Sequence, residues 1–286
     1  MGNVGRDIDS PLHAMSFEQL LSLSALLLLA AALVAWAVAA QRRSPYKPVE
    51  SLLFLASVFF TRIMWRTEVE GKFPIPPDDG AVIVCNHGSS IDPFFIQLST
   101  GRVVHWMVAR EFTDFPLFRP FFRATQSIPT NRAGIDTAAT KLAIRYASEG
   151  RLVGMLPEGK VNLTGKLLTG GRPGAALVAL RARVPVVPCY IDGAPFDGTF
   201  WGCFLMTAHV RVKIGHPLDL SSYFDRVKQP GVLQEVTLLI LREIAALAGH
   251  PDFQPELAGR RWKPGMEDDE PPTDEFQVPS LRVSRA

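Results

Sequence analysis

An uncharged apolar segment, LLSLSALLLLAAALVAWAVAA (residues 20–40), restricts most strongly what the beginning of this chain can fold into. At about 1.5 Å rise per residue, a helix of this length crosses a hydrocarbon layer of roughly 30 Å. The sequence therefore predicts a transmembrane helix at 20–40, preceded by an N-terminal tail at 1–19.

A cleaved signal peptide is the alternative, because Ala37-Val38-Ala39 has the small-residue spacing of a cleavage site. Signal peptides, however, begin with a basic region and have shorter apolar regions. Here Asp7, Asp9 and Glu18 precede the segment, and only Arg6 opposes them. A retained helix is therefore the preferred interpretation.

Basic residues follow this segment at Arg42, Arg43 and Lys47. Because cytoplasmic loops carry an excess of Lys and Arg, they predict that the C-terminal side faces the cytoplasm.

A second apolar segment at 51–66 contains Arg62 and ends in Trp65 and Arg66. This composition suits an anchor helix at the membrane interface, and it is equally compatible with a first core helix. Together with 20–40, the segment predicts a helical membrane anchor that carries a globular domain.

The rest of the chain is long and apolar enough for one substantial core, with 286 residues in total and 47% hydrophobic content. A net charge of +2 argues against nucleic acid as a partner, which requires a strong basic excess. The sequence predicts one globular domain at 67–249 and a disordered tail, rich in proline and acidic residues, at 250–286.

Strand and helix patterns alternate through this domain, which is the signature of an α/β fold with a mostly parallel sheet flanked by helices. The strands are expected at 81–85, 103–109, 151–156, 184–191 and 208–214. The helices are expected at 93–100, 136–148, 173–183 and 231–249. Asp92 and Asp136 are predicted N-caps, and Pro188 favours an edge strand or a strand end.

The three cysteines, Cys85, Cys189 and Cys203, are odd in number and lie in apolar contexts without CxxC spacing. This pattern predicts buried, reduced thiols rather than a disulfide framework or a zinc site. The histidines show no HExxH or similar spacing either, so no metal is assigned.

His87 and Asp92 lie in CNHGSSIDPFF (85–95), directly after a predicted core strand. An imidazole with a near-neutral pKa can act as a general base, and a carboxylate on its other nitrogen fixes the tautomer. GxSxG is absent, so the attacking group would belong to a substrate, most simply a hydroxyl. From spacing alone, a strand-end hydrogen bonder and a helix cap explain the two residues equally well.

Further candidates for ligand binding lie in turns near other strands, and such turns converge on one cleft in open α/β sheets. An arginine before a helix can hold a phosphate, and a glycine lets a ligand approach the backbone. Each motif, taken alone, is also compatible with a solvated charge or a tight turn. The candidates are Arg132 in IPTNRAG, Glu158, Gly159 and Lys160 in PEGK, and Arg172 in TGGRPG.

Taken in order, NHGSSIDP, REFTDFPLFRPFFRATQSIPTNR, LPEGK and VPVVPCYI resemble the four blocks of the glycerolipid acyltransferase family. The best-known members of that family are lysophosphatidic acid (1-acyl-sn-glycerol-3-phosphate) acyltransferases. The resemblance covers about residues 66–219, and the first block is the most specific.

The resemblance implies that His87 deprotonates a lysolipid hydroxyl, which attacks the thioester of an acyl-CoA or acyl carrier protein, and that Asp92 supports the histidine. Arg132 matches the arginine linked to the acceptor phosphate. Glu158 and Gly159 match the third block.

Pro185 and Pro188 match the fourth block. The third block departs from the usual EGTR, because Lys160 and Val161 stand in place of its threonine and arginine. Lys160 or Arg172 is a candidate source of the missing charge.

The implied function is acyl transfer to a lysophospholipid, with 1-acyl-glycerol-3-phosphate as the expected acceptor and phosphatidic acid as the product. Membrane lipids and acyl carrier protein are the implied partners, and no cofactor beyond the thioester co-substrate is implied. The alternatives are an esterase or thioesterase that activates water, an acyltransferase for a different lysolipid, and a nonenzymatic membrane module.

Overall fold

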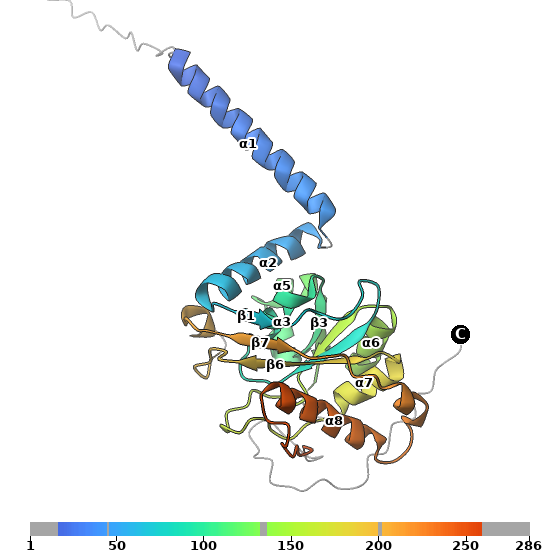
Figure 1. Cartoon of the computed structure of the whole chain (residues 1–286). Coiled ribbons are helices and arrows are strands. Elements are labelled where there is room, and N and C mark those ends of the chain that lie inside the picture. Colours follow the sequence, from blue (N-terminus) through green and yellow to red (C-terminus); the bar gives the residue numbers. More distant parts are fainter. Residues whose placement is uncertain (1–16, 45, 132–135, 200–201, 259–286) are drawn as a thin grey trace, which may run out of the picture. The chain divides into compact units, whose positions relative to one another are not determined.

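The computed structural model describes residues 17–44, 46–131, 136–199 and 202–258 (Figure 1). Within it the chain divides into two compact units, and the division falls between Pro48 and Val49.

The first unit contains the helix α1 (Phe17–Arg43), which includes the whole predicted segment 20–40 and has no buried residue. Within the described residues it is the one helix long and apolar enough to cross a membrane, by length and composition. Glu18 lies in its first turn, and Arg42 and Arg43 lie in its last turn, so these charges complement the helix dipole.

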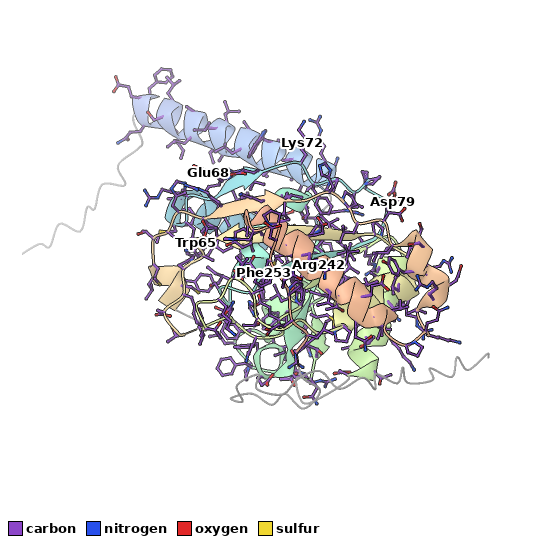
Figure 2. The ribbon with its side chains drawn as sticks, turned by 60° about the horizontal axis from the view of Figure 1, so that its bottom comes forward. Trp65, Glu68, Lys72, Asp79, Arg242 and Phe253 are labelled. Carbon is purple, nitrogen blue, oxygen red and sulfur yellow. The ribbon has the colours of Figure 1, made fainter. Side chains whose placement is uncertain are left out.

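The second unit begins with α2 (Pro48–Phe59), which continues as a short π-helix, η1 (Phe60–Met64). Trp65 follows it and is fully buried (Figure 2), and its indole N–H donates to the carbonyl of Cys203 at 3.1 Å. The end of segment 51–66 is therefore part of the core, which agrees with the interpretation of this segment as a first core helix. One side of α2 and η1 is buried at Ser57 and Thr61, and the other side exposes the apolar residues Val49, Leu52, Leu55, Phe59 and Ile63.

A seven-stranded sheet forms the centre of this unit, with the strand order β1-β7-β6-β2-β5-β3-β4. All neighbouring pairs are parallel except β6 with β7, which confirms the predicted mostly parallel α/β fold. The strands are β1 (Glu68–Glu70), β2 (Ala81–Cys85), β3 (Val104–Ala109), β4 (Ile128–Thr130), β5 (Leu152–Met155), β6 (Val186–Asp192) and β7 (Arg211–Ile214).

Helices pack against both faces of the sheet (Figure 1). One buried apolar cluster joins the sheet to α6, α7 and α8, and a second joins it to α3 and Trp65. The helices are α3 (Asp92–Thr100), α4 (Arg110–Thr113), α5 (Arg119–Ala124), α6 (Thr137–Ser148), α7 (Gly174–Ala182) and α8 (Val232–Leu247); the short 3-10 helices are η2 (Gly202–Leu205) and η3 (Ser221–Arg226).

Of the two predicted helix caps, one is confirmed and one is wrong. Asp136 is the N-cap of α6, and its side chain accepts from the main-chain N–H of Ala139. Asp92, in contrast, is the first residue inside α3, whose N-cap is Ile91. The Asp92 carboxylate faces back toward Ser89 and His87 instead of the helix N–H groups, so it is not available as a cap.

The prediction that Pro188 marks an edge strand or a strand end is also wrong, because it lies inside β6, between β2 and β7. Its carbonyl accepts from Gly215 N, the first residue after β7, at 2.8 Å. The N–H and C=O of one strand residue point toward the same neighbouring strand. In any residue other than proline, the N–H at position 188 would therefore point toward the end of β7. An interior strand tolerates the proline because β7 has already ended there.

The chain beyond α8 remains in contact with the domain. Phe253 packs against the first apolar cluster, and Glu256 and Ala258 pair with Gly171 through two main-chain hydrogen bonds. The remainder of the predicted tail, 259–286, lies outside the described residues.

We expect Gly154→Ala to destabilise the domain by about 1–3 kcal/mol, because an added Cβ would overlap the Trp106 ring in the neighbouring strand β3. Denaturant unfolding measures this cost. Trp106→Leu should cost less in the Gly154→Ala background than in the wild type, since it removes the atoms that clash. Additive free energies in this double-mutant cycle would contradict the explanation.

Candidate active site

His87 and Asp92 form a buried pair beyond the carboxyl end of β2. The ring Nδ1 of His87 lies 3.0 Å from Oδ2 of Asp92. His87 is 9% exposed, whereas Asp92 is 0% exposed. The imidazole of His87 therefore has some access to the surface, whereas the Asp92 carboxylate has none.

The hydrogen bonds of Asp92 indicate how the proton is placed. Its Oδ2 also accepts from the main-chain N–H of Ser89 at 2.9 Å, as expected of an ionised carboxylate oxygen. Nδ1 of His87 is then the donor to Asp92, and in the neutral imidazole Nε2 carries the lone pair. Burial raises the pKa of the Asp92 carboxyl, and the hydrogen bonds from His87 and Ser89 oppose this shift.

The backbone of His87 is held on both sides by the loop after β5. Its N–H donates to Oε1 of Glu158 at 2.8 Å, and its carbonyl accepts from Asn162 N–H at 2.7 Å. With Asp92 on the ring, the backbone and the side chain of the histidine are both fixed.

Glu158 was predicted from the sequence to bind substrate, and in the structure it is 2% exposed. Oε1 accepts from His87, and Oε2 accepts from both the N–H (2.7 Å) and the hydroxyl (2.8 Å) of Thr169. Burial raises the pKa of the Glu158 carboxyl, and these donors lower it in part. Both of its oxygens are thus engaged by groups of the protein itself.

Arg172 lies on the PEGK turn, and both belong to the connection between β5 and α7. Gly159 has φ +72°, and an added Cβ would lie 3.1 Å from Cδ and Nε of Arg172. The Arg172 main-chain N–H donates to the Pro157 carbonyl at 2.9 Å. A guanidinium stem therefore lies over Gly159, the residue that follows Glu158, and Lys160 is half-buried beside it.

The two remaining predicted site residues are Pro188 and Arg132. Pro188 is buried in β6, opposite Val84 of β2. Arg132 lies outside the described residues; the segments on either side of it are joined by a hydrogen bond from Asn131 N–H to Oδ2 of Asp136 at 3.0 Å.

The sequence missed several residues that support the site. Asn86 bonds with its side-chain amide to the N–H and C=O of Ile191 in β6. Ser89 donates its hydroxyl to the Pro195 carbonyl at 2.6 Å. Asn162 contacts His87, which follows a different strand, and Thr169 contacts Glu158 from 11 residues further along the same connection. No short-range spacing signals these contacts.

The cysteines are free and buried, as predicted. Burial raises the pKa of the Cys85 thiol well above its usual range and that of Cys189 to about 12, so neither is an activated nucleophile. Among the described residues, no group of three or more His, Cys, Asp or Glu side chains is arranged to hold a metal ion.

The family model described as Acyltransferase matches residues 66–192, which include β1 to β6 and the His87–Asp92 pair. The chain is 26% identical over 159 residues to a 1-acyl-sn-glycerol-3-phosphate acyltransferase of Bacillus subtilis, and the match covers 54% of this chain and 75% of that protein. It is 30% identical over 150 residues to an uncharacterised protein of Mycobacterium bovis, with 48% of this chain and 40% of the relative covered.

A crystal structure of a 1-acyl-sn-glycerophosphate acyltransferase from Thermotoga maritima matches with a TM-score of 0.49 and 24% identity, over 66% of this chain and 74% of that one.

We expect Glu158→Gln to lower the free energy of unfolding by about 1–3 kcal/mol, because either orientation of the amide turns an NH2 group toward a main-chain N–H of His87 or Thr169. Denaturant unfolding measures the loss. Glu149→Gln, on an exposed carboxylate, is the control and should change stability by less than about 0.5 kcal/mol. Equal effects of the two substitutions would contradict this account.

Proposed function

We propose that this chain transfers a fatty acyl group from acyl-CoA or acyl carrier protein to the free hydroxyl of a lysophospholipid. The proposal starts from the membership of residues 66–192 in the glycerolipid acyltransferase family. The proposed acceptor is 1-acyl-glycerol-3-phosphate, which gives phosphatidic acid. The observation that carries this proposal is the buried His87–Asp92 pair, in which Nδ1 lies 3.0 Å from Oδ2 of the carboxylate. With Nδ1 as the donor to Asp92, Nε2 of the neutral imidazole is left to act as the base.

In the proposed mechanism, Nε2 of His87 accepts the proton of the acceptor hydroxyl as its oxygen attacks the thioester carbonyl. Asp92 stabilises the imidazolium that forms, through the hydrogen bond at Nδ1. The tetrahedral intermediate then collapses, the C–S bond breaks, and the imidazolium returns its proton to the departing thiolate. The ester and the free thiol are the two products.

A membrane location follows from the nature of the substrates. Extracting a lipid chain into water costs about 0.8 kcal/mol per methylene, so an enzyme that stays at the membrane avoids this cost. The helix α1, whose central segment 20–40 is uncharged, would provide the anchor, and Arg42 and Arg43 at its end favour a cytoplasmic position of the domain.

Arg172 is the residue we assign to the charge of the acceptor headgroup. Its side chain lies over Gly159, one residue from the carboxylate that holds the His87 backbone. A guanidinium offers paired donors to a phosphate, which a lysine does not. Lys160 adds positive charge on the same turn.

We expect His87→Ala to abolish the formation of diacyl lipid from a labelled acyl thioester and 1-acyl-glycerol-3-phosphate in detergent or liposomes, at unchanged thermal stability. His216→Ala, which removes an exposed histidine beyond β7, is the matched control and should keep wild-type activity. Both acyl-CoA and acyl carrier protein donors are needed in the assay.

Two results of this assay would decide against the proposal. Release of free fatty acid without diacyl lipid would favour the esterase or thioesterase alternative. Equal activity of wild type and His87→Ala would remove His87 from the role of base.

We expect Arg172→Gln to raise KM for 1-acyl-glycerol-3-phosphate about tenfold, because one charge-assisted contact is lost, with little change in KM for the acyl donor. Initial-rate kinetics with each substrate varied in turn measures this. Arg183→Gln, on an exposed arginine that pairs with Asp225, is the control. An equal loss with an uncharged-headgroup acceptor would show that Arg172 does not bind the phosphate.

A further inference from the structure

Glu158 is a buried carboxylate whose place in the fold differs from that of a ligand-binding residue. Its Oε1 meets the N–H of His87, and its Oε2 meets Thr169 twice. A carboxylate removed from water in this way depends on its donors, since an unpaired charge in the interior is strongly disfavoured. Movement of Thr169 would therefore disturb how Glu158 holds His87.

The Thr169 hydroxyl helps to fix the orientation of the Glu158 carboxylate. Because its N–H and hydroxyl both donate to Oε2, the carboxylate is held in the orientation that directs Oε1 to the histidine. Thr169 is itself buried. The hydroxyl thus adds a second donor to Oε2, and this donor opposes a rotation of the carboxylate that would break the contact with His87.

The segment that follows Thr169 is fixed on both sides. An added Cβ at Gly170 would lie 2.9 Å from Ala258 N, and Gly171 exchanges main-chain hydrogen bonds with Glu256 and Ala258. Arg172 N–H is bonded to the Pro157 carbonyl, beside Glu158. Thr169 therefore enters the site from a backbone that has little freedom to shift.

We propose that Thr169 and Glu158 are positioning residues that set the location of the His87 imidazole through its backbone, and that Glu158 does not bind the substrate. The inference rests on the proposed function, since it assigns His87 the role of base. Asp92 orients the ring, Asn162 holds the His87 carbonyl, and the Thr169–Glu158 pair holds its N–H. Neither positioning residue touches the reacting atoms.

The test uses the full-length chain in detergent with Thr169→Val, which keeps the side-chain shape and removes the hydroxyl. Thr169→Ser, which restores the hydroxyl, is the conservative variant. Thr237→Val is the matched control, because Thr237 is also buried and donates its hydroxyl to a carbonyl, that of Leu233 in α8, away from the site. The two valine variants should lose similar amounts of thermal stability.

Two measurements are made on each protein. Amide hydrogen exchange of the peptide that contains His87 reports on the hydrogen bond to Glu158, and we expect about five- to tenfold faster exchange in Thr169→Val alone. Steady-state kinetics should show kcat for acyl transfer reduced on the order of tenfold, with KM for both substrates nearly unchanged, because the base is displaced and the substrate sites are not. Thr169→Ser should restore most of kcat.

The results separate this inference from the proposed function. Unchanged exchange in Thr169→Val would show that the threonine does not hold His87, and faster exchange with unchanged kcat would show that the contact has no catalytic role; either overturns the inference. A higher KM for the acceptor with kcat retained would also overturn it, since Glu158 would then act on substrate binding. An inactive wild type would overturn the proposed function and the catalytic part of the inference, while exchange would still decide whether the contact with His87 exists.

Discussion

The parallel pairing of β2 with β5 is the constraint on which the site depends. Val84 lies opposite Met155, so the segments that leave these strands begin side by side at one edge of the sheet. This places His87 within hydrogen-bond distance of Glu158, which is 71 residues further along the chain. A register shifted by two residues would move the two groups apart by about 7 Å and leave the carboxylate without that donor.

Two buried carboxylates hold different parts of one histidine. Asp92 contacts the ring, and Glu158 contacts the main chain. Burial raises the pKa of both carboxyls, and hydrogen-bond donors oppose part of the shift in each case. Because loss of a donor would leave a charge both buried and unpaired, this arrangement resists distortion. The rigidity suits a general base, whose efficiency depends on its distance from the proton that it accepts.

Local sequence patterns predicted a residue's role correctly where that role lies within its own helix or strand. They failed where a neighbouring strand or loop determines the contacts of the residue. The alternation of apolar runs and turns predicted the strands at β2 and β5, and Asp136 caps α6 as expected. Asp92 was taken for a cap because its position before Pro93 fits one, but the histidine and Ser89 compete for its carboxylate. Pro188 was assigned to an edge strand or a strand end because the sequence of β6 does not show that the neighbouring strand β7 ends beside it.

The sequence by itself determined the apolar helix and the α/β class, because hydrophobic periodicity is a local property of a chain. The five-residue spacing of His87 and Asp92 was compatible with their contact, and it was equally compatible with a strand-end residue and a helix cap. Tertiary structure alone decided that Thr169 and Asn162 support His87, and that Arg172 lies over Gly159. The contact of Asn162 with His87 joins the connections that follow β5 and β2, which the pairing of these strands brings together. Thr169 and Arg172 lie in the same connection as Glu158 and Gly159, and the path of that long connection brings them together. Spacing along the chain does not reveal such neighbours, since sheet pairing sets the first distance and the path of a long connection sets the others.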